Sequence, residues 1–159
     1  MRGVLYRLYY KIRRSEIEKA KIRLKKMKVD TILQCLTKDC WKNNIQYELI
    51  IKTNEMFIIK LFGRRTNSLF KYHNTEMVYI DDFKRFVYDF ELSDASKAIY
   101  ITTGVFEPKI IKLRHSMFFN KKVKIYDNYA FIKNQLGFNG TVQEIFNKKK
   151  LKFFDYFPG

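Results

Sequence analysis

Two cysteines and two histidines are the residues best suited to metal or nucleophilic chemistry, and their spacing supports neither. Cys35 and Cys40 form C-x4-C without a second Cys/His pair, whereas a structural zinc site needs four ligands. His73 and His115 fall in no recognisable motif with a serine or cysteine nucleophile. We therefore expect buried or half-buried thiols, surface histidines and no bound metal at these residues.

An acidic pair offers a second candidate for metal chemistry. Asp81 and Asp82 are adjacent in a segment, residues 76–92, whose apolar residues recur at helical spacing. Neighbouring side chains on a helix point about 100° apart, so two adjacent carboxylates do not easily hold one ion. The pair is better interpreted as part of a solvated helix face.

Positive charge is the strongest chemical signal in the chain. The 32 lysines and arginines outnumber the 16 acidic residues, which gives a net charge of +16 and a pI of about 9.8. Self-repulsion of this size weakens a compact state unless a polyanion neutralises it, so we expect a nucleic-acid partner. A transmembrane segment is not expected, because no apolar run approaches about 20 residues.

The positive charge gathers in three segments. Between Lys11 and Lys28, nine basic residues face two acidic ones. A basic loop is predicted over residues 63–75, and lysines interleave with aromatics in the tail, where most aromatics are expected to pin the tail to the body. The residues expected to contact nucleic acid are Arg2, Arg7, Lys11, Arg13, Arg14, Lys21, Arg23, Lys25, Lys26, Arg64, Arg65, Lys71, Lys148, Lys149, Lys150 and Lys152.

The cellular location is constrained only by composition. Two cysteines and no secretory signal favour an intracellular, reducing compartment. Residues 1–14 carry five basic residues and no acid, which is typical of a mitochondrial presequence. We expect this segment to be retained as working sequence, and a mitochondrial location stays an open alternative.

The elements that must position these residues are clearest over residues 97–127. Residues 98–103 predict a strand, Pro108 suits the first turn of a helix, and residues 123–126 predict a second strand. Strands joined by a helical crossover usually lie parallel and adjacent, which indicates an α/β fold.

The remaining elements are a hairpin and further helices. The hairpin is predicted over residues 46–52 and 56–62, and helices over residues 4–28, 30–41, 76–92 and 128–136. Asp30 and Asp127 are predicted N-caps, Gly137 a helix stop, and Thr141 to Glu144 a capping box. We expect one domain, residues 1–137, which includes the basic helix 1–28, followed by a basic aromatic extension, residues 138–159.

The element order resembles that of the Mrr-type restriction-endonuclease-like (PD-(D/E)XK) superfamily. AIYITTGVF, from Ala98, resembles the family's strand ending in Thr-Thr-x-x-Phe, and VKIYDNYAFIKNQL, from Val123, resembles its final strand and helix. Gly3-Val4-Leu5-Tyr6 is similar to the glycine and aromatic that open its first helix. The resemblance covers about two-thirds of the chain and implies a mixed central sheet flanked by helices, here with a basic N-terminal helix and C-terminal tail.

The family's chemistry needs an acidic residue on one strand and the pattern Glu/Gln-x-Lys on the next. The carboxylates hold Mg²⁺, and the lysine positions the nucleophile or offsets charge. Glu48 falls at the first acid and Lys60 at the lysine, but Ile58 occupies the middle position. The resemblance therefore implies an incomplete metal site. Glu48 and Lys60 are vestigial candidates, and the alternative for them is a simple cross-strand ion pair.

Two main functional hypotheses and one weaker alternative follow. The first is a non-catalytic nucleic-acid-binding protein without cofactor, an RNA-binding component of a large ribonucleoprotein such as a mitochondrial ribosome. Its partners would be RNA, favoured over DNA, and other proteins of that assembly. The alternative is an active Mg²⁺-dependent DNA endonuclease or resolvase in which Glu55 or Glu76 replaces the missing carboxylate. A third, weaker alternative is a viral or plasmid-encoded DNA-binding factor.

Overall fold

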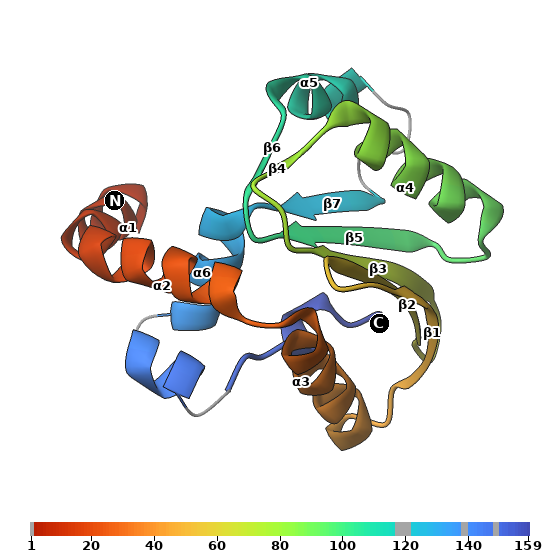
Figure 1. Cartoon of the computed structure of the whole chain (residues 1–159), viewed down its shortest axis with the longest axis horizontal. Coiled ribbons are helices and arrows are strands. Elements are labelled where there is room, and N and C mark those ends of the chain that lie inside the picture. The colour runs from red at the N-terminus through yellow and green to blue at the C-terminus, as the bar shows by residue number, and fades with distance from the viewer. Residues whose placement is uncertain (1, 117–121, 138–139, 148–149) are drawn as a thin grey trace.

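A mixed five-stranded sheet lies at the centre of the molecule, in the order β1-β2-β3-β5-β7 (Figure 1). The computed structural model describes residues 2–116, 122–137, 140–147 and 150–159. The first three strands pair antiparallel, and β3, β5 and β7 pair parallel. A short parallel pair, β4 with β6, stands apart from this sheet. The strands are β1 (Gln46–Lys52), β2 (Met56–Phe62), β3 (Asn67–His73), β4 (Met77–Val78), β5 (Lys97–Thr102), β6 (Val105–Phe106) and β7 (Val123–Tyr126).

Helices cover both faces of the sheet. Figure 1 shows α4 and α5 over one face, while α3, α6 and the C-terminal segment lie on the other. No described helix is long and apolar enough to cross a bilayer. The helices are α1 (Arg2–Ile12), α2 (Arg14–Lys26), α3 (Val29–Lys42), α4 (Ile80–Leu92), α5 (Pro108–Ser116) and α6 (Asn128–Leu136), followed by a π-helical turn (Gln143–Asn147) and a 3-10 turn (Phe154–Tyr156).

Each face of the sheet has its own apolar core. On the α3 side, Phe70 stacks beside Phe57 and meets the edge of Phe153 from the tail. On the α4 side, Phe86 and Phe106 both contact Tyr100 of β5 edge-on. The prediction that tail aromatics pin the tail is confirmed for Phe153 and Tyr156, which are buried, whereas Phe154 is exposed.

The predicted strand–helix–strand unit is confirmed. β5 and β7 are adjacent and parallel, with Ala98 opposite Val123, and α5 begins at Pro108. Gly104 follows β5 at a point where a Cβ would clash with a backbone oxygen of Glu76, so this close approach requires glycine.

The predicted caps in the C-terminal third are confirmed as well. Asp127 Oδ1 accepts a hydrogen bond from the Ala130 amide at 2.8 Å, and Gly137 ends α6 with a φ of 53°. Of the predicted capping box, the structure shows one of the two reciprocal hydrogen bonds, in which Thr141 Oγ1 accepts from the Glu144 amide at 3.2 Å.

The predicted loop over residues 63–75 is wrong. Most of it is β3, which lies in the middle of the sheet between β2 and β5. Leu69 faces the α4-side core, whereas Phe70 and Tyr72 belong to the α3-side core. The polar residues Asn67, Ser68, Lys71 and His73 obscured this strand in the sequence, because a central position overrides local polarity.

Three smaller predictions also need correction. The N-terminal helix is interrupted at Arg13, where α1 gives way to α2. Asp30 is not an N-cap, because Lys28 occupies that position and Asp30 lies in the first turn of α3, paired with Lys52. The helix predicted from residue 76 begins at Ile80, because β4 uses the preceding residues to pair with β6.

Both cysteines lie in α3, buried and outside any disulfide bond, as expected of structural thiols. Burial, followed by the nearby Asp39 charge, raises the pKa of Cys40 to about 12. A thiol with so high a pKa is protonated at neutral pH and is a poor nucleophile.

Candidate nucleic-acid interface

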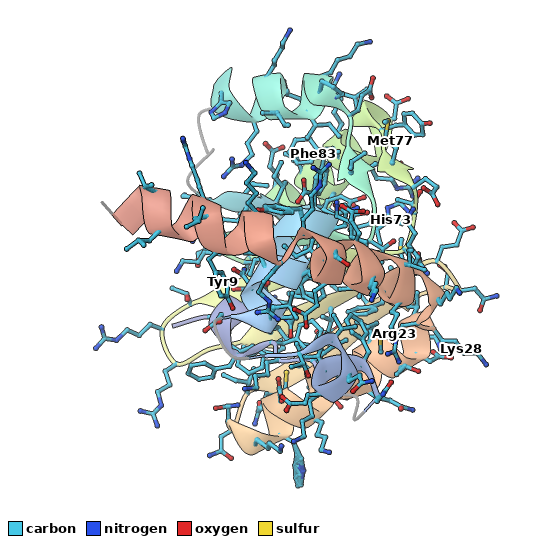
Figure 2. The ribbon with its side chains drawn as sticks, turned by 90° about the vertical axis from the view of Figure 1, so that its left-hand side faces the viewer. Tyr9, Arg23, Lys28, His73, Met77 and Phe83 are labelled. Atoms are coloured by element: carbon cyan, nitrogen blue, oxygen red, sulfur yellow. The ribbon has the colours of Figure 1, made fainter. Side chains whose placement is uncertain are left out.

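The basic arm, which we define as α1 and α2 (residues 2–26), carries a row of charged residues along one groove. Arg7 and Lys11 of α1 and Arg14, Glu18 and Lys21 of α2 all line the same groove, although the helix is interrupted between them at Arg13. Residues 1–28 contain eleven basic and two acidic residues, more than half of the net charge of +16. Figure 2 looks onto this arm, with Tyr9 and Arg23 labelled along it.

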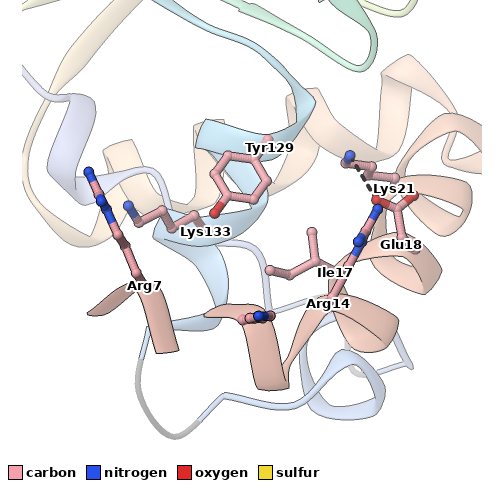
Figure 3. Close-up of a pocket in the computed structure, with 8 residues that line it drawn as sticks. Arg7, Arg14, Ile17, Glu18, Lys21, Tyr129 and Lys133 are labelled. Carbon is pink, nitrogen blue, oxygen red and sulfur yellow. Dashed lines mark hydrogen bonds and ion pairs between the residues drawn. The ribbon is translucent and has the colours of Figure 1, made fainter. Parts of the chain in front are cut away.

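A groove of about 450 Å³ separates this row from α6 (Figure 3). Ile17, 1% exposed, contributes to its lining from α2, and Tyr129 and Lys133 from α6. We call this the arm groove, lined by Arg7, Lys11, Arg14, Ile17, Glu18, Lys21, Tyr129 and Lys133.

The cations of the arm groove differ in their engagement with the protein. Lys21 Nζ forms an ion pair with Glu18 at 3.1 Å and lies 5.9 Å from the centre of the Tyr129 ring. Arg7, Lys11 and Arg14 are exposed and form no ion pair within the part of the chain that the structure describes. These three are therefore available to an external anion.

Arg13 has a different role from the one predicted for it. Its guanidinium donates to Glu16 at 2.7 Å, to the Tyr9 hydroxyl at 2.6 Å and to the carbonyl oxygens of Gly137 and Gly140. The Tyr9 hydroxyl donates to the same Gly137 oxygen at 3.1 Å. With its donors used in this way, Arg13 fastens the arm to the end of α6 rather than presenting its charge to solvent.

Some of the cations at the end of α2 also contact other parts of the protein. Arg23 lies over the Phe146 ring at 5.6 Å and donates to the Asn147 side chain. Lys25 Nζ forms an ion pair with Glu76 at 2.7 Å, while Lys26 is exposed. The last turn of a helix favours positive charge, so these residues stabilise α2 as well as its contacts.

The other predicted contacts are scattered. Arg64 and Arg65 are exposed in the turn between β2 and β3, and Lys150 and Lys152 are exposed beside α3. The Arg2 side chain, Lys148 and Lys149 lie outside what the structure describes. The structure therefore brings together Arg7, Lys11, Arg14 and Lys21 of the predicted set, and separates them from the turn and tail residues.

Lys71 is the predicted contact that the structure contradicts. It lies in β3 and is 5% exposed, with Nζ 4.9 Å from the centre of the Tyr100 ring. Burial lowers the pKa of Lys71, an effect that Asp82 and Asp89 of α4 oppose. A lysine so enclosed does not reach a phosphate at the surface.

A buried polar cluster surrounds this lysine, and the sequence did not reveal it. His73 Nδ1 lies 2.8 Å from the Tyr100 hydroxyl, and burial, then the Lys71 charge, lowers the pKa of His73. His73 is thus half-buried rather than a surface histidine. Leu69, Phe70 and Tyr72 are compatible with a strand, but their pattern does not indicate that the lysine between them is buried.

Glu48 and Lys60 lie directly opposite each other on β1 and β2, as the hairpin implies. The predicted ion pair between them is wrong, because Lys60 Nζ pairs with Asp94 after α4. Ile58 adds no ligand, and Glu76, a proposed substitute, is paired with Lys25. Among the described residues no group of three His, Cys, Asp or Glu side chains could hold a metal ion, so the residues at this position do not fit Mg²⁺.

Comparison with known proteins leaves the family open. No protein-family model matches the chain, and no curated protein matches it. A solved structure described as the MspJI restriction endonuclease in complex with a 27-mer oligonucleotide is similar, with a TM-score of 0.37 and 14% sequence identity over 92% of this chain. The match covers 34% of that protein's chain. This is a distant resemblance in fold.

Proposed function

We propose that this protein binds nucleic acid without cleaving it, through phosphate contacts in the arm groove. The observation that carries the proposal is the row of Arg7, Lys11 and Arg14, exposed and without an ion-pair partner among the described residues, along one groove wall. Lysine and arginine rows bind a phosphate backbone with release of counterions and without reading sequence.

The test is a pair of charge-matched variants. Lys11→Glu/Arg14→Glu changes the arm groove, and Lys84→Glu/Lys112→Glu makes the same change in net charge on α4 and α5, across the sheet. Binding of a fluorescently labelled nucleic acid is followed by anisotropy between about 50 and 200 mM salt, a range over which multiple phosphate contacts weaken affinity by orders of magnitude.

We expect the arm variant to bind at least about tenfold more weakly, with a salt slope reduced by roughly one for each phosphate that the protein no longer neutralises. The control should weaken much less, because its residues lie on α4 and α5, over the face of the sheet that α6 does not cover. Equal effects would show that only net charge matters and would remove the arm groove from the proposal. An affinity independent of salt would contradict the electrostatic model altogether.

The absence of cleavage forms a separate part of the proposal. Its support is that Glu48 faces a lysine already paired with Asp94, and that Ile58 offers no ligand. Plasmid incubated with the protein and Mg²⁺ or Mn²⁺ should remain intact. Cleavage that Glu48→Ala abolishes would instead support the endonuclease alternative.

The finer proposal is that the ligand is RNA within a ribonucleoprotein, with other proteins as neighbours. Its support is the spread of exposed cations, since Arg64 and Arg65 at the β2–β3 turn and Lys150 and Lys152 in the tail lie away from the arm groove. A protein enclosed by a polyanion benefits from positive charge on several sides. Tighter binding to an RNA than to the matched DNA would support it, and the reverse preference would contradict it.

A further inference from the structure

The exposed aromatic side chains around α3 form a second surface of interest. Trp41, the single tryptophan of the chain, is 72% exposed at the end of α3, and Tyr47 at the start of β1 is 47% exposed. Phe154, in the 3-10 turn of the tail, is 63% exposed. Rings of this size bury much apolar surface when they are covered, so their joint exposure indicates a binding surface.

Two grooves run along this part of α3 and share one lysine. Trp41, Tyr47 and Ile45 help to line the first, and Phe154 helps to line the second. Lys38 lines both, so the grooves adjoin. We call the two grooves together the α3 surface. Its other lysines, all in the second groove, are Lys42, Lys150 and Lys152.

The charge of the α3 surface is positive. Its four lysines are exposed and form no ion pair within the described part of the chain. The one carboxylate that lines it, Asp39, accepts a hydrogen bond from the Phe153 amide at 2.8 Å and so helps to hold the tail in place. A partner for this surface therefore needs negative charge together with flat apolar faces.

We propose that the α3 surface binds unpaired nucleotides, with bases stacked on Trp41 and Tyr47 and phosphates held by Lys38 and its neighbours. This inference rests on the proposed function and adds to it a ligand class and a second site. Single-stranded nucleic acid combines a charged backbone with exposed base faces, and stacking on aromatic side chains accepts any base. A duplex fits poorly, because its base faces are covered by their neighbours.

The place of the α3 surface distinguishes it from the arm groove. Figure 1 shows the arm extending from one end of the molecule beside α6, whereas α3 and the tail lie below the sheet. The two sites share no lining residue. A nucleic acid with a duplex part in the arm groove and a single-stranded part beyond it would thus contact two separate surfaces of the protein.

The test uses Trp41 as its own probe. Because the chain has one tryptophan, its fluorescence reports on this surface alone. A single-stranded oligonucleotide of about 12 nucleotides, within the range of site sizes of single-strand-binding folds, should quench it at concentrations where anisotropy shows binding. The same sequence as a duplex should bind with much less quenching. Binding of the single strand without any change in Trp41 fluorescence would overturn the inference.

Variants supply a second measurement. Trp41→Ala should weaken single-strand binding by roughly tenfold, within the range expected for the loss of one stacked base. Trp41→Phe should restore most of the affinity, which shows that a ring is needed. Tyr88→Ala is the matched control, since Tyr88 is 60% exposed on α4, across the sheet. Equal affinity of the wild type and Trp41→Ala for the single strand would contradict the proposal.

The outcomes separate the two proposals. If the protein binds no nucleic acid even at low salt, the proposed function fails and the α3 site fails with it. If the arm variant weakens duplex binding while Trp41→Ala changes nothing, the α3 site fails alone. A shift in Trp41 fluorescence on raising protein concentration without nucleic acid would identify a protein interface there and also overturn the inference.

Discussion

Lysines and arginines occur in two opposite environments in this molecule. Lys11 and Arg14 of the basic arm are exposed beside a groove, whereas Lys71 lies in the middle of the sheet, 5% exposed and above the Tyr100 ring. Burial disfavours the charged form of an amine, and this lowers the pKa of Lys71. Charge on the arm is thus available to a ligand, while charge on Lys71 opposes folding. Four substitutions test this contrast and the packing that creates it.

The largest expected effect is at the junction of tail and core. Phe153 is fully buried and Phe154, its neighbour, is exposed. Phe153→Ala should lower the free energy of unfolding by about 3–5 kcal/mol, because it leaves a cavity among packed rings. Phe154→Ala is the control and should change it by less than about 0.5 kcal/mol. Denaturant titration measures both, and similar losses would contradict the packing described for the tail.

Arg13→Ala should act on the arm alone. The change removes the hydrogen bonds to Glu16, Tyr9, Gly137 and Gly140, and charged hydrogen bonds are each worth about 1.5–3 kcal/mol. We expect faster hydrogen exchange in residues 2–12 with little change in the sheet. Arg14→Ala, one residue on and exposed, should leave exchange nearly unchanged. Protection that survives Arg13→Ala would mean that these hydrogen bonds do not hold the arm.

Lys71→Met should stabilise the protein at neutral pH by about 1 kcal/mol, since an apolar side chain of similar length replaces a buried charge that has no ion-pair partner among the described residues. Lys11→Met on the arm should be close to neutral for stability and should weaken nucleic-acid binding. Thermal denaturation of the two variants measures this difference in stability. A marked loss of stability in Lys71→Met would show that the cation–ring contact outweighs burial.

The last prediction concerns the pH dependence of stability at His73. Burial, then the Lys71 charge, lowers the pKa of His73 from 6.5. Below pH 6.5 the unfolded state therefore binds a proton that the folded state does not. As the pH is lowered from 6.5, the free energy of unfolding decreases until the pH reaches the lower pKa that His73 has in the folded state. One proton contributes at most about 1.4 kcal/mol per pH unit. In His73→Gln this part of the slope should disappear from denaturation curves measured below about pH 6.5, and curves measured above that pH should change little. An unchanged slope below pH 6.5 would exclude His73 as its source.

Local patterns in the sequence predicted several elements well. The unit from β5 to β7, the Asp127 cap and the Gly137 stop follow from β-branched runs, a proline and a glycine, and each of these acts within a few residues. The hairpin of β1 and β2 was predicted for the same reason. The concentration of positive charge between Lys11 and Lys28 was also visible in advance, because it depends on composition alone.

Long-range contacts account for what the sequence missed. Nothing near Lys71 in the chain distinguishes a buried lysine from a loop lysine, and its burial depends on β2 and β5 on either side. The sequence does not distinguish Arg13 from the other cations of the arm, because its hydrogen-bond partners Gly137 and Gly140 follow α6, more than 100 residues away. Lys60 likewise found Asp94, 34 residues away, in place of its cross-strand neighbour Glu48.

The sequence by itself determined that this chain is strongly basic, that it folds as an α/β protein, and where its positive charge is concentrated. These properties depend on composition and on periodicities of about two and 3.6 residues, which are local. Only the tertiary structure decided which cations face solvent, which one is buried, and that Trp41 and Tyr47 line one groove. The exposure of a side chain depends on contacts between segments that are far apart in the sequence, and no local pattern specifies those contacts.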